Sequence, residues 1–298
     1  MSRTVTVGLD GSPESLAAAD WAAREAELRG LPLHLVHAWD WQPYAEPVSD
    51  DAKHRHWAQR VLREALERLR HAHPGLAVTS DQVPQIPTTA LLTASENADV
   101  LAIGSRGVSG LVGFLVGSVS LAVVAQTDRP VVLVRSGARA EDEHRPDADG
   151  RPSTSTPHRD VVLGLDHEHP DAAVIEFAFE AAAARAATLR VVHGWSLPPY
   201  FAYGLAVDAS LDEELDRQEK NAVTEALAPW RAKFPGVEVV EQTAVGSAGE
   251  HLVDAAQDAS LLVVGRRVRR APLGARIGPV THAVLHHAKA PVAVVPHE

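Results

Sequence analysis

The amino-acid sequence predicts an α/β protein built from two tandem units, each with a five-stranded parallel sheet that helices cover on both faces. Short apolar runs alternate with longer amphipathic stretches, and strands that alternate with helices form parallel sheets of this kind. The pattern then repeats: residues 161–166 (VVLGLD) echo residues 5–10 (VTVGLD), and residues 191–195 (VVHGW) echo residues 35–39 (LVHAW). A second copy of the elements indicates a second copy of the fold.

The first unit contains five apolar runs that predict strands and four stretches between them that predict helices. The strands are expected at residues 4–9, 31–38, 76–83, 98–103 and 130–135. Ser12 and Pro13 predict the start of the first helix, as a capping residue and a favoured first residue, and Gly30 predicts its end. The other helices are expected at residues 50–73, 88–97 and 121–125, the last of them opened by Gly117-Ser118.

The second unit repeats this order after a polar segment. Asp166 matches Asp10 and Gly278 matches Gly117, offsets of 156 and 161 residues, so the second copy holds five additional residues after its second strand. Residues 136–159 contain almost no large apolar side chain, and such a segment is too polar to order itself. We therefore expect domains at residues 1–136 and 159–298, joined by a flexible linker at residues 137–158.

Composition limits the class of protein. The chain has 298 residues, of which 45% are hydrophobic and 22% charged, and it contains no cysteine, which excludes disulfides and thiolate chemistry. No apolar run reaches the roughly 20 residues that span a membrane, and the N-terminal residues lack an apolar signal core. We therefore expect a cytoplasmic protein without a membrane partner. A net charge of −11 argues against nucleic acid as a partner.

A glycine-rich stretch at residues 104–120 (GSRGVSGLVGFLVGSVS) lies between a predicted strand and a predicted helix. Its glycines let the backbone approach a ligand closely, and the free amides at a helix start attract anions. The stretch therefore predicts a phosphate site, with a mobile glycine-rich loop as the alternative interpretation. It matches neither a Walker loop nor a dinucleotide fingerprint. If the strands at 4–9 and 98–103 are neighbours, Asp10 and Gly104 flank one crevice.

The second copy of this stretch, residues 265–283 (GRRVRRAPLGARIGPVTHA), departs from the first. Val268 replaces the second glycine and Pro279 replaces the serine after the third, and proline has neither a hydroxyl nor an N–H to offer an anion. The segment also carries five arginines: Arg266, Arg267, Arg269, Arg270 and Arg276. Arginine side chains can bind phosphate in place of the backbone, but a solvated basic face, or pairing with acids, explains the same pattern.

The 16 histidines do not form a catalytic or metal-binding pattern along the sequence. His54 and His56, like His71 and His73, lie two residues apart on predicted helices and so point to different sides. His37 and His193 end equivalent strands, where we expect hydrogen-bonded structural histidines. No nucleophile stands next to a base. We predict no catalytic residue and no metal ligand.

With the repeat established, each half resembles a universal stress protein domain, on the spacing G-x-x-G, nine residues, G-[ST] and the strands around it. The resemblance implies the strand order 3-2-1-4-5, as in other adenine-nucleotide-binding relatives of the Rossmann fold, and ATP in the crevice, with or without Mg²⁺. Matched position by position, Asp10 and the Ala38 backbone would meet the adenine. The ribose and phosphates would meet Gly104, Arg106, Gly107, Gly117, Ser118, Ser120 and the Val119 amide. A weaker second site would keep Asp166, Gly194, Gly265, Gly278 and Thr281.

The first copy also departs from the family at Gln85, where glycine is usual. The sequence is thus identified as a tandem member of the ATP-binding subclass, a stress-response or regulatory module with an adenine nucleotide and an unknown regulatory protein as partners. A slow ATPase or phosphotransferase that uses the same site is the alternative, and a nucleotide-free structural protein is the third interpretation. The apolar strands at 130–135 and 291–295 are expected at sheet edges. We expect them to pair within the chain as a pseudo-dimer, and the family resemblance adds a homodimer.

Overall fold

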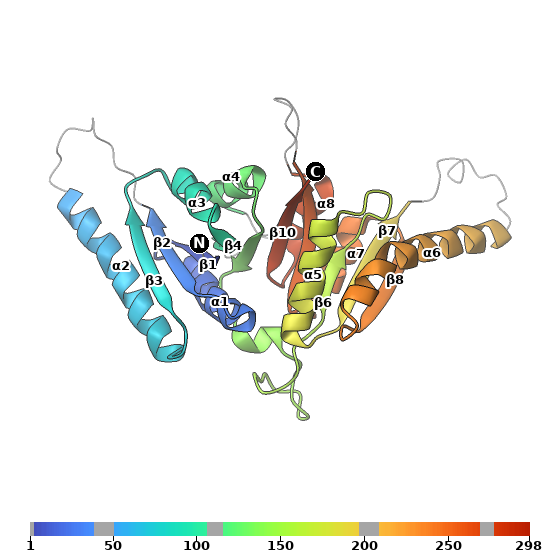
Figure 1. Cartoon of the computed structure of the whole chain (residues 1–298), viewed down its shortest axis with the longest axis horizontal. Coiled ribbons are helices and arrows are strands. Elements are labelled where there is room, and N and C mark those ends of the chain that lie inside the picture. Colours follow the sequence, from blue (N-terminus) through green and yellow to red (C-terminus); the bar gives the residue numbers. More distant parts are fainter. Residues whose placement is uncertain (1–2, 39–50, 106–115, 197–208, 269–276) are drawn as a thin grey trace. The chain divides into compact units, whose positions relative to one another are not determined.

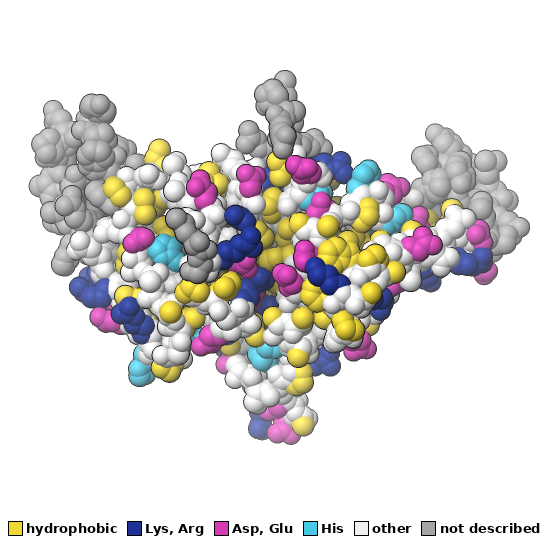
Figure 2. All heavy atoms as spheres, viewed as in Figure 1, with side chains coloured by type: hydrophobic (Ala, Val, Ile, Leu, Met, Phe, Trp, Pro, Cys, Tyr) yellow, Lys and Arg dark blue, Asp and Glu magenta, His cyan; other side chains and the backbone are white. Residues whose placement is uncertain are grey.

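The computed structural model describes residues 3–38, 51–105, 116–196, 209–268 and 277–298. The chain forms two compact units, residues 1–140 and residues 141–298, and each unit is an α/β fold with its own sheet (Figure 1). On the face of the molecule shown in Figure 2, acidic and basic side chains are interspersed over each unit. Within the described residues, no helix combines the length and the apolar character that a membrane span requires.

The first unit contains the five strands and four helices that the sequence predicts. In chain order they are β1 (Thr4–Leu9), α1 (Pro13–Arg29), β2 (Leu33–Ala38), α2 (Asp51–Ala72), β3 (Val78–Val83), α3 (Pro87–Ser95), β4 (Ala98–Ser105), α4 (Ser118–Gln126) and β5 (Val131–Arg135). Each neighbouring pair of strands is parallel, in the order β3-β2-β1-β4-β5. This confirms the fold class and the strand order for the first unit.

The second unit repeats the arrangement. It contains β6 (Val161–Gly164), α5 (Ala172–Arg185), β7 (Leu189–Trp195), α6 (Ala209–Lys233), β8 (Val239–Val245), α7 (Ala248–Ala255), β9 (Leu261–Arg267), α8 (Pro279–His287) and β10 (Val292–His297). Its strands are again parallel, in the order β8-β7-β6-β9-β10, which is the same topology counted from β6. The internal repeat of the sequence is therefore a repeat of structure.

Helices cover both faces of each sheet. In the first unit α1 and α2 pack on one face and α3 and α4 on the other; in the second unit α5 and α6 face α7 and α8 in the same way (Figure 1). The interior strands are buried on both sides, so they read as continuous apolar runs: Leu33, Leu35 and Leu101 are fully buried, as is Trp21 of α1. The core of each unit thus lies between its sheet and its two helix layers.

The ends of α1 follow the predicted capping residues. Ser12 Oγ accepts a hydrogen bond from Ser15 N at 3.2 Å, Pro13 is the first helical residue, and Gly30 ends the helix in the left-handed conformation with φ 64°. α4 begins at Ser118 directly after Gly117, which confirms the helix start expected at Gly117-Ser118. This start brings the first turn of α4 to the end of β4.

The segment at residues 137–158, expected to be a flexible linker, is hydrogen bonded in the structure. It holds a short 3-10 helix, η1 (Ala140–Glu143), and an antiparallel bridge between His144 and His158. Asp147 Oδ1 accepts from the backbone N–H of Asp149 at 2.9 Å and of Arg151 at 2.8 Å. Hydrogen bonds from side chains to the backbone can order a segment that has few apolar residues. The polar composition alone therefore predicted flexibility where the structure shows hydrogen-bonded turns.

Candidate functional site

A pocket of about 440 Å³ lies in the first unit, where the ends of β1 and β4 meet the starts of α1 and α4. β1 pairs with β2 on one side and β4 on the other, so strand order reverses here, where open α/β sheets bind ligands. Seven of the nine residues predicted for this site line the pocket: Asp10, Ala38, Gly104, Gly117, Ser118, Val119 and Ser120. The other two, Arg106 and Gly107, lie outside the described residues.

The turn between β1 and α1 holds the carboxylate of Asp10 in place. Asp10 Oδ1 accepts hydrogen bonds from Ser12 N at 2.9 Å and from Ser12 Oγ at 2.5 Å. Gly11, with φ 78°, supplies the left-handed residue that the turn needs. Because Ser12 is also the cap of α1, the start of this helix and the position of the carboxylate depend on the same side chain.

The start of α4 supplies backbone N–H groups to the pocket. Gly117 caps the helix in an extended conformation and has no side chain to accept from the first amides. The amides of Ser118, Val119 and Ser120 belong to the first turn and have no partner within the helix. The two serines differ: Ser118 is exposed, whereas Ser120 is buried and its Oγ donates to Gly104 O at 3.2 Å. A phosphate would have to displace this bond to receive the Ser120 hydroxyl.

Gly104, at the end of β4, is a glycine for a reason that the motif did not indicate. A Cβ at this position would lie 2.5 Å from Glu14 C and 2.7 Å from Ser15 N, both in the backbone of α1. No side chain fits between strand and helix at this distance. The sequence predicted Gly104 as a ligand-approach residue, and the structure shows that the protein's own packing already requires it.

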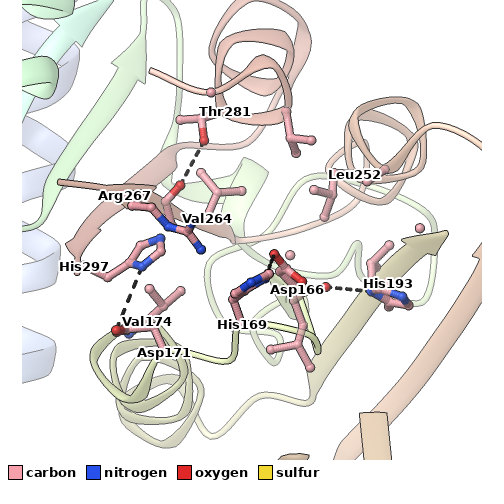
Figure 3. Close-up of a pocket in the computed structure, with 18 of the residues that line it drawn as sticks. Asp166, His169, Asp171, Val174, His193, Leu252, Val264, Arg267, Thr281 and His297 are labelled. Carbon is pink, nitrogen blue, oxygen red and sulfur yellow. Dashed lines mark hydrogen bonds and ion pairs between the residues drawn. The ribbon is translucent and has the colours of Figure 1, made fainter. Parts of the chain in front are cut away.

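A second pocket, of about 510 Å³, occupies the equivalent place in the second unit (Figure 3). All five residues predicted for the weaker site line it: Asp166, Gly194, Gly265, Gly278 and Thr281. Thr281 Oγ1 donates to Gly265 O at 2.9 Å, which repeats the bond from Ser120 to Gly104 in the first unit. The framework of the pocket is therefore the same in both units.

The start of α8 differs from the start of α4 in the way that the sequence indicates. Pro279 is its first residue and lines the pocket, so this turn offers one amide and one hydroxyl fewer than α4. A Cβ at Gly265 would lie 2.8 Å from His297 Nε2, so the ring of His297 would have to shift to admit one. A Cβ at Gly278 would meet no atom of the described residues within 4 Å, so their packing does not require a glycine there.

The second pocket also has polar groups that the sequence did not single out. His169 Nδ1 lies 3.4 Å from Asp166 Oδ2, and His297 Nδ1 lies 3.9 Å from Asp171 Oδ2 (Figure 3). Asp171 caps α5, and His297 is the last residue of β10, so neither position carries a signal in the sequence that marks a site. Of the five arginines, Arg267 lines the pocket and Arg266 is buried; the remaining three lie outside the described residues.

The two equivalent strand-end histidines make the backbone hydrogen bonds expected of structural residues. His37 Nδ1 lies 2.7 Å from Leu9 O, and His193 Nδ1 lies 2.8 Å from Leu165 O. Both rings are buried. A carbonyl oxygen only accepts, so Nδ1 carries the proton in each ring.

The fold and the two pockets define a tandem doubly wound α/β protein with a ligand crevice at the switch point of each sheet. The Universal stress protein family model matches residues 1–135 and 157–296, which confirms that this chain belongs to that family. Universal stress protein Rv2005c of Mycobacterium tuberculosis is 31% identical over 97% of this chain and 96% of its own length. Universal stress protein Rv1996 of the same species is 28% identical over 97% of this chain and 94% of its own.

Solved structures show the same fold. The crystal structure of a universal stress protein from Archaeoglobus fulgidus superposes with a TM-score of 0.69 at 16% identity and covers 100% of both chains. A putative universal stress protein from Pseudomonas aeruginosa gives a TM-score of 0.57 at 18% identity, over 99% of this chain and 93% of that one. The fold of the whole chain, with its two units, therefore recurs over nearly the whole length of these two chains.

Proposed function

We propose that this universal stress protein is a stress-response module that binds ATP in the pocket of its first unit. The start of α4 carries the proposal: Ser118 and Val119 line the pocket, their amides have no partner within the helix, and the dipole of α4 favours an anion there. Asp10 lines the same pocket at the end of β1, where a neutral part of the ligand would lie. A ligand with an anionic end near the start of α4 and a neutral end near Asp10 would fit this pocket, and a nucleotide has both.

In this proposal the amides of Ser118 and Val119 and the Ser118 hydroxyl hold phosphate oxygens. Asp10 and the Ala38 backbone hold the adenine, as the family resemblance implies. Arg106 and Gly107 would complete the phosphate side, and Mg²⁺ would accompany the phosphates if it binds at all. The second unit is proposed as a weaker site, because Pro279 removes an amide and a hydroxyl while Arg267 and Thr281 keep the pocket polar.

Two measurements test the first site. Mass spectrometry of the ligand extracted from gently purified protein identifies what the pocket holds. Calorimetry with ATP then compares the native chain with Gly117→Val and Ser118→Pro, both of which we expect to lose most of the binding. Proline is tolerated at the first residue of a helix, as Pro279 shows in α8, so Ser118→Pro should still fold. Undiminished ATP affinity in both variants would contradict the proposal.

Ser118→Ala separates the two contributions of this residue. It keeps the amide and removes only the hydroxyl, so it should bind ATP more weakly than the native chain and more tightly than Ser118→Pro. We further infer that the protein acts in the cytoplasm, through a regulatory protein that responds to its nucleotide state. Pairing of the two units, and of two chains, stays a prediction from the sequence.

A further inference from the structure

Two histidines and a glutamate from separate elements meet in the second unit. His167 lies in the turn between β6 and α5, His193 on β7, and Glu219 on α6. Glu219 Oε2 is 2.5 Å from His167 Nε2 and 3.3 Å from His193 Nε2, and the two imidazole rings are 4.5 Å apart between centroids. All three side chains offer a metal-ligating atom, and these atoms lie within 4.8 Å of one another.

The orientation of His193 leaves a ligating nitrogen in the middle of this group. Its Nδ1 donates to Leu165 O, so in the neutral ring Nε2 carries a lone pair. That nitrogen is buried, makes no hydrogen bond within the described part of the chain, and faces a carboxylate oxygen; the side chain is 9% exposed. A lone pair against a carboxylate is repulsive in a buried place, and a cation between them removes the repulsion.

We propose that His167, His193 and Glu219 form a Zn²⁺ site, with water as the fourth ligand. Two imidazoles and a carboxylate are a common ligand set for zinc. Zinc–ligand bonds of about 2.0–2.1 Å in a tetrahedron place the ligand atoms about 3.3 Å apart. The separation of His193 Nε2 and Glu219 Oε2, 3.3 Å, already has this value. The 2.5 Å between His167 Nε2 and Glu219 Oε2 must widen by about 0.8 Å, and His167 lies in the connection between β6 and α5. The backbone bond to His193 Nδ1 fixes the ring as outer-shell partners of metal-bound histidines do.

The first unit provides an internal comparison. His37 keeps the bond that orients His193, but the positions that match His167 and Glu219 are Gly11 and Ala58, which offer no metal ligand. The site is therefore a property of the second unit, where the nucleotide signature is degraded. Spacing along the sequence could not reveal it, because the three ligands come from a turn, a strand and a helix.

A metal ion at this site would tie the turn after β6 to α6. Asp166, the residue before His167, lines the second pocket, and His193 lines it as well. The ion would therefore hold one wall of that pocket in place and stabilise the folded chain as any specific ligand does. The proposal does not depend on nucleotide binding, so zinc alone is the probe.

The test is calorimetric titration of ZnCl₂ into the untagged full-length chain in a buffer that does not bind zinc. We expect one tight site per chain with a Kd in the micromolar range or below. His167→Gln and Glu219→Gln should each weaken binding roughly tenfold or more. His169→Gln is the matched control: this histidine lies two residues from His167 and faces Asp166, and its loss should leave the affinity within about twofold. Co²⁺ in place of Zn²⁺ should give the visible bands of tetrahedral coordination in the native chain and in His169→Gln, but not in His167→Gln or Glu219→Gln.

Melting temperatures with and without zinc guard against misfolded variants. With EDTA present, native chain and variants should melt cooperatively at similar temperatures, and zinc should raise the value of the native chain and of His169→Gln only. Binding weaker than about 100 μM, unchanged affinity in both His167→Gln and Glu219→Gln, or an equal loss in His169→Gln would each overturn the proposal.

Discussion

At the residue scale, the pockets contain glycines of two kinds. Gly104 and Gly265 lie near the ends of equivalent strands; the backbone of α1 leaves no room for a Cβ at Gly104, whereas a Cβ at Gly265 would meet the movable ring of His297. At Gly278 a Cβ would meet no atom of the described residues within 4 Å, so their packing does not explain this glycine. A glycine signature therefore mixes positions that the fold requires with positions that this packing does not require, and the sequence alone does not separate them.

Ser118 and Ser120 should respond differently to the same substitution. Ser120→Ala removes a buried hydrogen bond to Gly104 O, so we expect a loss of about 1 kcal/mol in the free energy of unfolding. Ser118→Ala removes an exposed hydroxyl, so it should leave stability almost unchanged and weaken ATP binding. Urea denaturation and calorimetry on the two variants check this. The opposite assignment of the two effects would show that Ser120 is the ligand residue.

Arg29 is the residue whose removal should destabilise the first unit most clearly. Burial by itself would lower its pKa, but the charges of Glu25 and Asp99, at 2.6 and 3.0 Å, outweigh this and raise the pKa. Glu25 is fully buried, so Arg29→Met leaves its carboxylate without this cation. We expect a loss of about 3–5 kcal/mol in the free energy of unfolding.

Arg3→Met is the control for this effect. Arg3 pairs with the same Asp99, at 3.3 Å, but its side chain is 63% exposed. Exposed pairs contribute about 0–1 kcal/mol, so urea denaturation should separate the two variants by at least about 2 kcal/mol. Equal losses would mean that the position of Asp99, and not the burial of Glu25, makes Arg29 important.

At the scale of elements, most of the fold could be predicted from periodicity, and the exceptions have physical causes. Buried parallel strands and capped helices leave strong local signals, so β1 and both ends of α1 fell where expected. The order within residues 137–158 comes from the hydrogen-bonded turn at Asp147 and the bridge between His144 and His158. Neither feature requires apolar residues, so the hydrophobic pattern of the sequence does not predict it. Asp171, at the start of α5, and His297, at the end of β10, both line the second pocket because the fold brings these two elements together. Strand and helix periodicity in the sequence does not predict this contact.

The starts of α4 and α8 provide a reciprocal test of the proposed function. Pro279→Ser restores to α8 the amide and hydroxyl that α4 has. In a chain whose first site is removed by Gly117→Val, we expect this change to strengthen ATP binding roughly tenfold, the effect of about one charge-assisted hydrogen bond. Calorimetry with and without Pro279→Ser measures it. No gain would show that the second pocket lacks more than this helix start.

At the scale of the whole molecule, one fold appears twice with pockets that differ. The first unit has Ser118 at the start of α4, whereas the second has Pro279 at the start of α8 and a histidine–glutamate group beside its pocket. Family membership and the sheet topology that both units have follow from the repeat, whereas the two pockets differ through a few positions at which the copies differ. Comparison of the two halves of the sequence identified Pro279. Glu219 was identified only from its contacts with His167 and His193 in the structure.

The protein as a whole should hydrolyse ATP slowly. Residues 104–120 contain no lysine, and the sequence places no base beside a water-binding position. We expect turnover far below the typical enzyme value of about 10 per second, with or without Mg²⁺. A phosphate-release assay on the full chain measures this. A metal-dependent rate near the typical value would make the alternative, an ATPase or phosphotransferase, the better description.

Gly278, which lines the second pocket, is a position for a reporter group. The backbone there has φ −70°, which any residue adopts, and a Cβ would meet no atom of the described residues within 4 Å. The chain has no cysteine of its own, so Gly278→Cys would be the single thiol and could carry one fluorescent label without further changes. Such a label would sit at the mouth of one pocket only, and its emission would follow occupancy of the second unit while the first binds independently.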